Sequence, residues 1–228
     1  KGNLISLRGE KNLYAFNYTV SSDPSSSAFL IALTLLAPKS KLVIHNVLCN
    51  ETRIFFIKML KKINANIKIS NLRKVSGELV GSITISSSKL KPIIVSKNIG
   101  KFIDELPILF VIAALTKGVS KFKNIGDLKN KESNRILESK KIFDQAGIKC
   151  KITKNSMVIY GNDKIKTQNK SIVSKTEGDH RICMSSVIFA LVTGIKTKTE
   201  IKIDPEKECG TIHSNKEDGK TKTDSLDY

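Results

Sequence analysis

The sequence FIDELPILFVIAAL, residues 102–115, places an acidic residue, Asp104, shortly before a run that is apolar on every side. Such a run predicts a helix over Leu106 to Leu115 that is buried all round, because it has no polar face to turn toward water. The same outline occurs twice more, at Asp23 before Ala28 to Ala37 and at Asp179 before Ile182 to Val192. Its recurrence at intervals of about 75 to 80 residues indicates a molecule built of repeated units.

Each apolar run lies between segments that predict strands, and in two of the three units a second helix follows. The flanking strands are expected at Tyr18 to Val20 and Lys41 to Val47, at Ile93 to Ser96 and Lys121 to Ile125, and at Ile172 to Ser174 and Lys198 to Ile203. The second helices are expected at Arg53 to Asn64 and Glu132 to Ala146. Two closing strands follow each of them, Ile67 to Ile69 with Leu79 to Ser86, and Lys149 to Thr153 with Met157 to Tyr160.

The predicted fold class is therefore α/β, of the α+β kind, with repeated β-α-β-α-β-β units and buried central helices. The units cover residues 15–86 and 92–160, with an incomplete third unit at 171–203. Several strands alternate apolar and polar residues, so one face of each sheet is expected to meet solvent. Residues 206–228 are too poor in apolar side chains for us to expect an ordered tail. The first residue is not Met, and we expect the chain to be a piece of something longer.

The composition is that of an ordinary soluble globular protein. The chain has 228 residues, 40% of them hydrophobic and 26% charged, enough for one large domain or two small ones. Its longest apolar runs are too short to span a bilayer, and no signal peptide is recognisable. The four cysteines form no C-x-x-C pair and there are three histidines, so we expect no structural metal and a reduced, cytoplasmic setting.

The formal net charge of +18 has two interpretations. The protein binds an anionic partner, such as nucleic acid, an anionic membrane or a phosphorylated substrate, or its composition is simply biased toward lysine along the whole chain. The arginines are more informative, because Arg holds a phosphate or carboxylate with two parallel hydrogen bonds where Lys cannot. There are five of them: Arg8, Arg53, Arg73, Arg135 and Arg181.

Asp104 stands at an expected helix start and also has two interpretations. An Asp in this position is most often an N-cap that accepts a backbone N–H. It can instead act as a general base if it faces a substrate hydroxyl. A similar choice arises at Ser25 to Ser27, where a serine N-cap after the preceding proline turn is favoured over a phosphate site.

The run Lys131-Glu132-Ser133-Asn134-Arg135 opens another expected helix. Glu132 and Arg135 are three residues apart and share a face, and Lys131 can reach the same side. The run is either a solvated charged turn with an ion pair, or an anion cradle at the positive end of a helix. A third motif, Asp179-His180-Arg181, places Arg181 in the first turn of an apolar helix.

The three motifs occupy related places in the repeat, since each opens a helix of a unit. If the units surround a common axis, these helix starts converge on one surface. Two arginines, one lysine and two carboxylates would then line a single site for an anionic substrate: Arg135, Arg181, Lys131, Asp104 and Glu132. The sequence has no Gly-rich phosphate loop, no Ser/His/Asp triad spacing and no basic-aromatic pattern typical of nucleic-acid binding.

From about Asn3 to Pro205 the chain resembles the 5-enolpyruvylshikimate-3-phosphate synthases, transferases of the shikimate pathway. The resemblance rests on Ile103-Asp104-Glu105-Leu106-Pro107, on Lys131-Glu132-Ser133-x-Arg135 and on Asp179-His180-Arg181-Ile182-x-Met184, in this order. It implies two domains, each with three such units around a pseudo-threefold axis. Residues 1–9 would then be the last strand of a missing N-terminal domain, 10–14 a hinge and 15–205 the C-terminal domain, with a divergent tail at 206–228.

The resemblance also implies a reaction. The enolpyruvyl group of phosphoenolpyruvate is transferred to the 5-hydroxyl of shikimate 3-phosphate, with release of phosphate and without a cofactor. Asp104 then contacts the shikimate hydroxyls and accepts a proton, and Glu132 moves a proton at the phosphoenolpyruvate methylene. Lys131 contacts the side of the shikimate phosphate. Arg135 and Arg181 clamp phosphoenolpyruvate, a task that suits forked donors.

The chain departs from the family pattern at Asn134, where an Asp is usual, at Cys183, where an Ala is usual, and after Cys209. The missing domain would hold the phosphates from the opposite side, so we expect this chain alone to be inactive and the full-length enzyme to be monomeric. Two alternatives stay open: a UDP-N-acetylglucosamine enolpyruvyl transferase of the same fold, and a basic nucleic-acid-binding module. The preferred interpretation involves neither nucleic acid nor membrane.

Overall fold

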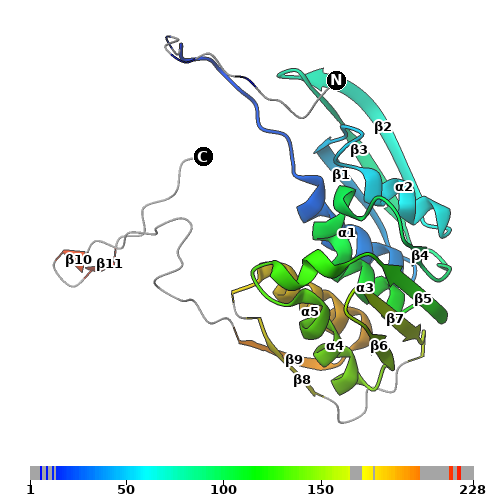
Figure 1. Cartoon of the computed structure of the whole chain (residues 1–228). Coiled ribbons are helices and arrows are strands. Elements are labelled where there is room, and N and C mark those ends of the chain that lie inside the picture. Colours follow the sequence, from blue (N-terminus) through cyan, green and yellow to red (C-terminus); the bar gives the residue numbers. More distant parts are fainter. Residues whose placement is uncertain are drawn as a thin grey trace.

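The computed structural model describes residues 6, 9, 12, 14–164, 171–176, 178–200, 216–217 and 220–221. Its helices are α1 (Pro24–Leu36), α2 (Phe55–Lys62), α3 (Leu106–Ala114), α4 (Arg135–Ala146) and α5 (His180–Thr193), with 3-10 turns η1 (Ile99–Lys101), η2 (Ile103–Glu105) and η3 (Gly126–Asn130) (Figure 1). Its strands are β1 (Lys41–Leu48), β2 (Asn66–Val75), β3 (Glu78–Ser86), β4 (Ile94–Val95), β5 (Gly118–Lys123), β6 (Cys150–Ile152), β7 (Ser156–Gly161), β8 (Ser171–Lys175), β9 (Lys196–Glu200), β10 (Lys216–Glu217) and β11 (Lys220–Thr221).

The strands of the three units repeat one pairing pattern. In the second unit the order is β4-β5-β7-β6, with β4 parallel to β5 and the other two pairs antiparallel. The first unit has the order β1-β3-β2, again with antiparallel pairs. The third unit contributes the parallel pair of β8 and β9. The corresponding order of strands confirms the repeat that the apolar runs predicted.

The strand expected at Tyr18 to Val20 is wrong. These residues join no ladder, and the side chains of Tyr18 and Val20 are exposed. In this first unit the parallel pairing consists of a single bridge between Ser22 and Val47, beside which Leu48 N–H donates to the carbonyl of Ser22 at 3.0 Å. Alternating apolar residues predict a strand only where their side chains can pack on a core, and here those of Tyr18 and Val20 stay exposed.

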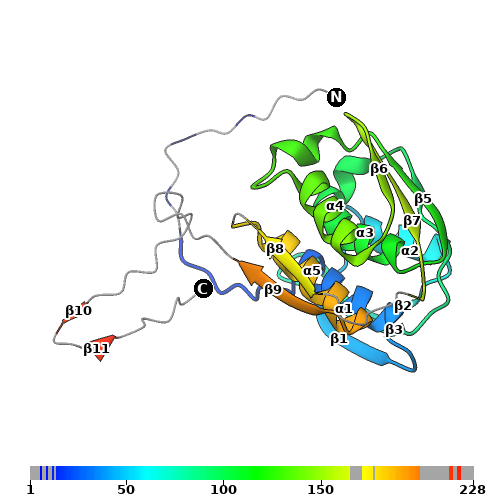
Figure 2. The same ribbon diagram turned by 90° about the horizontal axis from the view of Figure 1, so that it is seen from below.

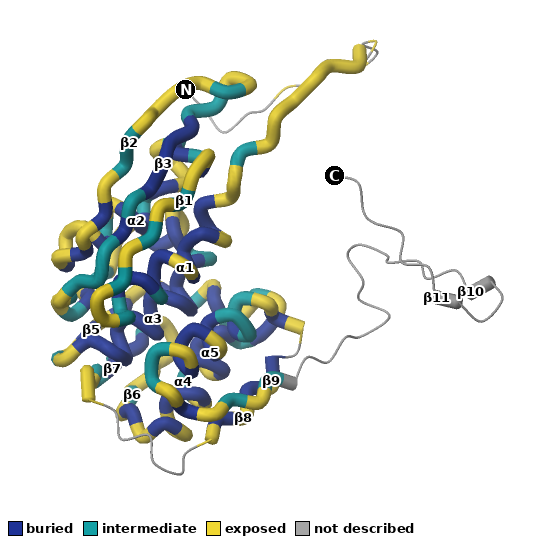
Figure 3. The backbone as a smooth tube through the Cα atoms, turned by 180° about the vertical axis from the view of Figure 1, so that it is seen from behind, coloured by how far each residue is buried: buried dark blue, intermediate teal, exposed yellow. Residues whose placement is uncertain are grey.

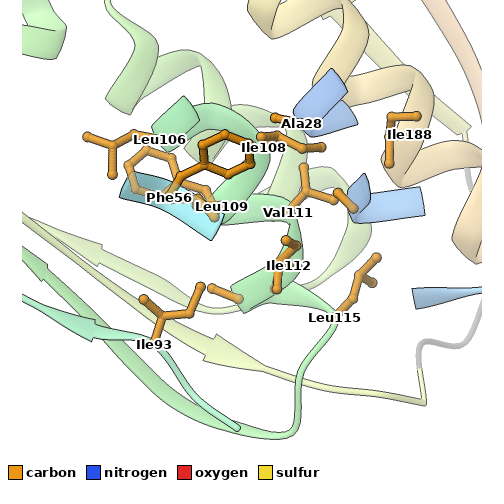
Figure 4. Packing of buried hydrophobic residues seen from close by; sticks show 14 of the residues in the cluster. Ala28, Phe56, Ile93, Leu106, Ile108, Leu109, Val111, Ile112, Leu115 and Ile188 are labelled. Atoms are coloured by element: carbon orange, nitrogen blue, oxygen red, sulfur yellow. The ribbon is translucent and has the colours of Figure 1, made fainter. Parts of the chain in front are cut away.

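The three apolar helices lie together in the middle of the molecule, where α1, α3 and α5 contact one another (Figure 1). Every residue of α3 is buried. Figure 4 shows its side chains Leu109, Val111 and Ile112 within the cluster that also holds Ala28 of α1 and Ile188 of α5. Helices without a polar face are therefore placed where no face meets water, as predicted.

The small sheets lie on different sides of these helices (Figure 2). Burial alternates along strands such as β5 and β8, so one face packs inward and the other meets solvent, whereas Val80 to Ile83 of the middle strand β3 are buried on both faces. Figure 3 shows the same division, with the buried residues gathered on the helices and on the inner faces of the strands. The predicted wet face is confirmed along the alternating strands.

The helix starts differ from one unit to the next. Asp23 caps α1 by accepting the N–H of Ser26 at 2.8 Å, so the cap is this aspartate and the predicted serine cap is wrong. Asp179 caps α5 by accepting the N–H of Arg181 at 3.0 Å. Asp104 caps nothing: it lies inside the turn η2, and α3 begins without a side-chain cap. Its carboxylate is thereby available for other partners.

Helix α4 begins at Arg135, three residues later than expected. The reason is Asn134, whose side chain accepts the N–H of Leu137 at 3.2 Å and so caps the helix at this point. An Asn serves this purpose as well as the Asp that is usual in the resembling family. Lys131 and Glu132 therefore lie on the turn that leads into the helix.

Several predictions fall on residues outside the described ranges. Most residues of the strand at 1–9, of the hinge at 10–14 and of the tail at 206–228 belong to this group; within the tail, the described β10 and β11 pair antiparallel. Among the described residues, no helix combines the length and the apolar character needed to cross a membrane.

Candidate active site

The site is centred on the guanidinium of Arg135, the first residue of α4. Its Nε donates to Asp179 Oδ2 at 2.8 Å, its Nη1 to Asp104 Oδ1 at 3.1 Å and its Nη2 to Glu132 Oε2 at 2.6 Å. The residue is fully buried, which is unusual for an arginine and requires partners of opposite charge. Three carboxylates supply that charge.

Asp179 is the buried member of this network, with no exposed surface. It caps α5, accepts from Arg135, and also accepts from Ser133 Oγ at 3.0 Å. Burial acts to raise the pKa of Asp179, but the hydrogen bonds from Arg135 and Ser133 and the charge of Arg135 outweigh it and hold the pKa below its ordinary value. The carboxylate therefore stays ionised and fixes the orientation of Arg135.

Asp104 lies at the mouth of the site. Its Oδ1 accepts from Arg135 and lies 3.3 Å from Lys131 Nζ, while its backbone carbonyl accepts from Arg181 Nη1 at 3.1 Å. Burial acts to raise the pKa of this carboxyl, but the charges of Arg181 and Lys131 and the hydrogen bonds from Lys131 and Arg135 lower it overall. Asp104 is thus held as a carboxylate among three cations.

The exposure of the charged side chains falls into two classes. The side chains of Arg135 and Asp179 are 1% and 0% exposed, whereas those of Asp104, Glu132 and Lys131 are 42%, 52% and 32% exposed. The buried pair forms the floor of the site, and the other three can meet a ligand. In this structure the terminal nitrogens of Arg135 are covered by Asp104 and Glu132.

A second contact supports the same turn from the side of α1. Ser25 Oγ donates to the carboxyl of Glu105, the neighbour of Asp104, and both residues are buried. Burial raises the pKa of Glu105 above its ordinary value, although the hydrogen bond from Ser25 and the charge of Arg181 act in the opposite direction. A hollow of about 130 Å³ lies beside this contact, lined by Ser25, Arg53, Asp104 and Glu105 among others.

Side chains from all three units hold the turn η2, although the sequence predicted this convergence only for the helix starts of the second and third units. Ser25 comes from the first unit, Lys131 and Arg135 from the second, and Arg181 from the third. The five residues singled out in the sequence are therefore brought together. His180, the middle residue of its motif, is exposed and is not part of the network.

Sequence reasoning missed four members of the site: Asp179 as the partner of Arg135, then Ser133, Glu105 and Ser25. Asp179 and Ser133 belonged to the motifs and could have been found by asking what balances a buried arginine. Glu105 also belonged to a motif, and Ser25 to the serine run, but nothing local marks their contact, since they are 80 residues apart and only the folded chain joins them. In the described part of the chain, no group of three or more His, Cys, Asp or Glu residues is placed to hold a metal ion.

Comparison with known proteins gives one consistent result. The family model described as EPSP synthase (3-phosphoshikimate 1-carboxyvinyltransferase) matches residues 1–209. The 3-phosphoshikimate 1-carboxyvinyltransferase of Helicobacter pylori (strain Shi470) is 37% identical over 196 residues, which are 83% of this chain and 46% of that protein. The enzyme of the same name from Clostridium tetani is also 37% identical, over 78% of this chain and 40% of its own length.

The solved structures agree. EPSP synthase from Acinetobacter baumannii superposes with a TM-score of 0.73 at 29% identity, covering 83% of this chain and 44% of that one. The enolpyruvyl transferase NikO from Streptomyces tendae has a TM-score of 0.56 at 12% identity, over 77% of this chain and 38% of its own, which shows a common fold. The chain spans less than half the length of these relatives. The motifs left two enolpyruvyl transferases open, the EPSP synthases and the UDP-N-acetylglucosamine enolpyruvyl transferases. The family model that matches is that of the former, and the chain belongs to the EPSP synthase family.

Proposed function

We propose that this chain supplies one half of the active site of a 3-phosphoshikimate 1-carboxyvinyltransferase. The complete enzyme transfers the enolpyruvyl group of phosphoenolpyruvate to the 5-hydroxyl of shikimate 3-phosphate and releases phosphate. The observation that carries this proposal is the cluster of Asp104, Glu132, Lys131 and Arg181 around the buried Arg135. Membership of the family supports the choice of substrates.

In this proposal Asp104 accepts the proton of the attacking hydroxyl. A general base must be ionised before the reaction and must reach the substrate. The lowered pKa of Asp104 meets the first condition, and its half-exposed side chain meets the second. In the same proposal Lys131, whose Nζ lies 3.3 Å from this carboxylate, contacts the phosphate side of the shikimate substrate.

Arg135 and Arg181 bind phosphoenolpyruvate, and for Arg135 this requires an exchange of partners. Asp179 keeps its hold on Nε, while an incoming carboxylate or phosphate takes the place of Glu132 at Nη2. Glu132 is 52% exposed, so it can move aside at little cost. Once released, it is free to move a proton at the phosphoenolpyruvate methylene, the role that the resemblance implies for it.

The proposal includes a partner that completes the site. Catalysis needs both walls of the site closed around the substrates, because precise placement of the reacting groups supplies much of the rate. We therefore expect this chain alone to be inactive, and the N-terminal domain of a relative to restore activity. The complete enzyme is expected to act as a monomer.

Reconstitution tests the function. The chain is co-expressed with the N-terminal domain of the Helicobacter pylori relative, and phosphate release from the two substrates is measured, with the intact relative as the positive control. We expect activity from the pair and none from either part. A pair that associates but releases no phosphate, while the intact relative does, would contradict the proposal.

The clamp is tested in the reconstituted enzyme by Arg181→Ala. A hydrogen bond to a charged group contributes about 1.5–3 kcal/mol, so the KM for phosphoenolpyruvate should rise about 10- to 100-fold. Arg73→Ala is the matched control, because Arg73 donates to the side chain of Asn46 on an exposed surface and not to a residue of the cluster around Arg135. An unchanged KM in Arg181→Ala would remove this residue from the clamp.

A further inference from the structure

A hollow of about 950 Å³ lies where the three central helices end. It is lined by Leu36 at the end of α1, by Leu115 directly after α3 (Figure 4) and by Thr193 at the end of α5. The candidate active site lies where these helices begin, since Asp104 precedes α3 and Arg181 belongs to the first turn of α5. The 14 residues of α5 span about 20 Å, so the hollow is separate from that site.

The rim of the hollow is strongly basic. It carries four lysines and one acidic residue, namely Lys89 and Lys91 between β3 and β4, Lys117 before β5, Lys164 after β7, and Asp163. All four lysines are exposed, and within the described residues none of them forms an ion pair. The charged residues around this basic hollow therefore give it a net charge of +3.

Two other hollows show that the abundance of lysine does not by itself produce such a rim. The hollow beside Ser25 has two cations, Arg53 and Lys101, and two acids, Asp104 and Glu105. The hollow between α4 and β8, of about 320 Å³, also has two of each. Positive and negative side chains are equal in number in both, whereas the basic hollow has four against one.

The ends of the helices account for part of the basic charge. The C-terminus of a helix is equivalent to about half a negative charge, so three of them contribute about −1.5. The side chains around the basic hollow carry about twice that charge with the opposite sign. The rim therefore stays positive after the helix ends have been balanced.

The walls of the hollow are held by backbone hydrogen bonds. Ser88 N–H donates to the Leu35 carbonyl at 3.0 Å and joins the segment after β3 to the end of α1. Asn162 N–H donates to the Ala114 carbonyl at 2.9 Å and joins the segment after β7 to the end of α3. These carbonyls have donors of their own, so they do not require the lysines.

The floor of the hollow is apolar. Leu36, Leu90 and Val192 line it, and all three pack on the hydrophobic core. Sites that bind small organic molecules have this character: a concave, mostly apolar surface with a few polar groups and a volume of about 300–1,000 Å³. The combination of an apolar floor with a basic rim fits a molecule that has an apolar body and an anionic group.

We propose that the basic hollow binds an organic anion with an apolar body, such as an aromatic phosphate or carboxylate. The body lies against Leu36, Leu90 and Val192, and the lysines of the rim hold the anionic group. This site is distinct from the one in which phosphoenolpyruvate and shikimate 3-phosphate are proposed to bind, and it does not depend on that function.

A titration of the chain alone with naphthyl phosphate tests the site, followed by the NMR signals of the backbone amides. The amides of Thr116, Lys117 and Thr193 should shift and saturate with a common Kd. Inorganic phosphate lacks the apolar body and naphthol lacks the charge, so each should bind at these amides about tenfold more weakly or less. Shifts at Arg181 report binding at the candidate active site and give a separate Kd.

Two double variants separate the hollow from the overall charge. Lys91→Glu with Lys117→Glu should weaken binding of naphthyl phosphate at Thr193 about tenfold, because two attractive contacts become repulsive. Lys74→Glu with Lys151→Glu is the control, since it changes the net charge equally at two exposed lysines that do not line the hollow. Its Kd at Thr193 should equal that of the wild type.

Three results would overturn the proposal. Shifts that never saturate would mean that the hollow holds no site. Equal binding of inorganic phosphate and naphthyl phosphate would mean that the apolar floor is not used. Equal weakening in the two double variants would mean that the total charge attracts the probe, and not the rim of the hollow.

The titration and the reconstitution fail independently. If reconstitution yields no enzyme but naphthyl phosphate saturates the amides of the hollow, the proposed function is wrong and the anion site stands. If the reconstituted enzyme is active and the probe does not saturate those amides, the function stands and the anion site is wrong.

Discussion

Arg135 is the residue on which the site depends, and its burial makes it a structural residue as well as a candidate ligand. Its removal would leave Asp179 buried without a cation, because no other charged side chain contacts that carboxylate in the described part of the chain. Breaking a buried pair from one side costs about 3–5 kcal/mol. A loss of activity in an Arg135 variant would therefore not by itself identify a substrate contact.

We predict that Arg135→Ala lowers the free energy of unfolding of the isolated chain by about 3–5 kcal/mol. Arg53→Ala is the matched control, because Arg53 pairs with Asp23 at 2.6 Å while both side chains remain nearly half exposed. An exposed pair contributes about 0–1 kcal/mol. Urea unfolding measures both, and equal losses in the two variants would show that the Asp179 pair is worth no more than a surface one.

The lowered pKa of Asp179 predicts how stability depends on pH. A group whose pKa is lower in the folded state stabilises the fold fully above its unfolded pKa, ordinarily 3.8 here, and loses that contribution as the pH falls through the folded value. Asp179→Asn cannot titrate. The gap in unfolding free energy between wild type and Asp179→Asn should therefore be widest near neutral pH and should narrow in acid.

Urea unfolding at several pH values gives that gap directly. Asn still caps helices well, so the variant keeps the start of α5 and loses chiefly the charge. A gap that stays constant from neutral pH down to about pH 2 would show that the charge on Asp179 does not stabilise the fold.

Among the elements, β7 passes so close to the end of α3 that Gly161 of β7 has no room for a side chain. A Cβ at Gly161 would lie well inside van der Waals contact with the carbonyl oxygens of Ala113 and Thr116, both of which are backbone atoms. The next residue, Asn162, donates its N–H to the Ala114 carbonyl at 2.9 Å, which holds the two elements together. This joint places the central helix against its sheet.

Gly161→Ala should therefore destabilise the chain by more than the about 1–3 kcal/mol typical of overpacking, since backbone cannot step aside as a side chain can. Gly100→Ala is the control, because a Cβ there would meet nothing within 4 Å. Thermal unfolding compares the two. A Gly161→Ala variant as stable as Gly100→Ala would show that β7 and α3 can separate at no cost.

The elements also show where sequence reasoning succeeds. The apolar run after Asp104 predicted α3 and its burial, because an all-apolar helix has only one kind of environment available. The same reasoning could not show that Asp104 sits in a separate turn and leaves the helix uncapped. That outcome depends on Arg135, Lys131 and Arg181, which reach Asp104 from other parts of the chain. Tertiary ion pairs outweighed a local preference for capping.

At the scale of the whole molecule, the five residues predicted for the site do converge, but of their ion pairs only that of Glu132 with Arg135 was foreseen. The sequence suggested a site open to an anion, whereas the folded chain covers Arg135 with its own carboxylates. Periodicity identifies which helices start together. It carries no information on which distant carboxylates, here Asp104 and Asp179, contact the guanidinium of Arg135, because that depends on how the elements pack.

The net charge of +18 leads to a prediction for the whole molecule, because both proposed substrates are anions. A positive protein attracts them, and salt shortens the reach of that attraction from about 30 Å at 0.01 M to about 8 Å at 0.15 M. In the reconstituted enzyme, kcat/KM should fall as sodium chloride is added. Sucrose at equal osmolarity is the control, and a kcat/KM that does not respond to salt would show that long-range charge plays no part.

The turn that carries Asp104 is held by side chains from all three units, and this has a consequence for how the site comes into being during folding. The three tethers bridge distant parts of the chain, and contacts between distant residues form late because long loops must close first. A chain in which one unit is still unfolded can possess a nearly complete core and yet hold Asp104 in no fixed place. The arrangement of Asp104 that the proposed reaction needs would then form only at the last step of folding, so that partly folded copies of the protein would have no catalytic activity.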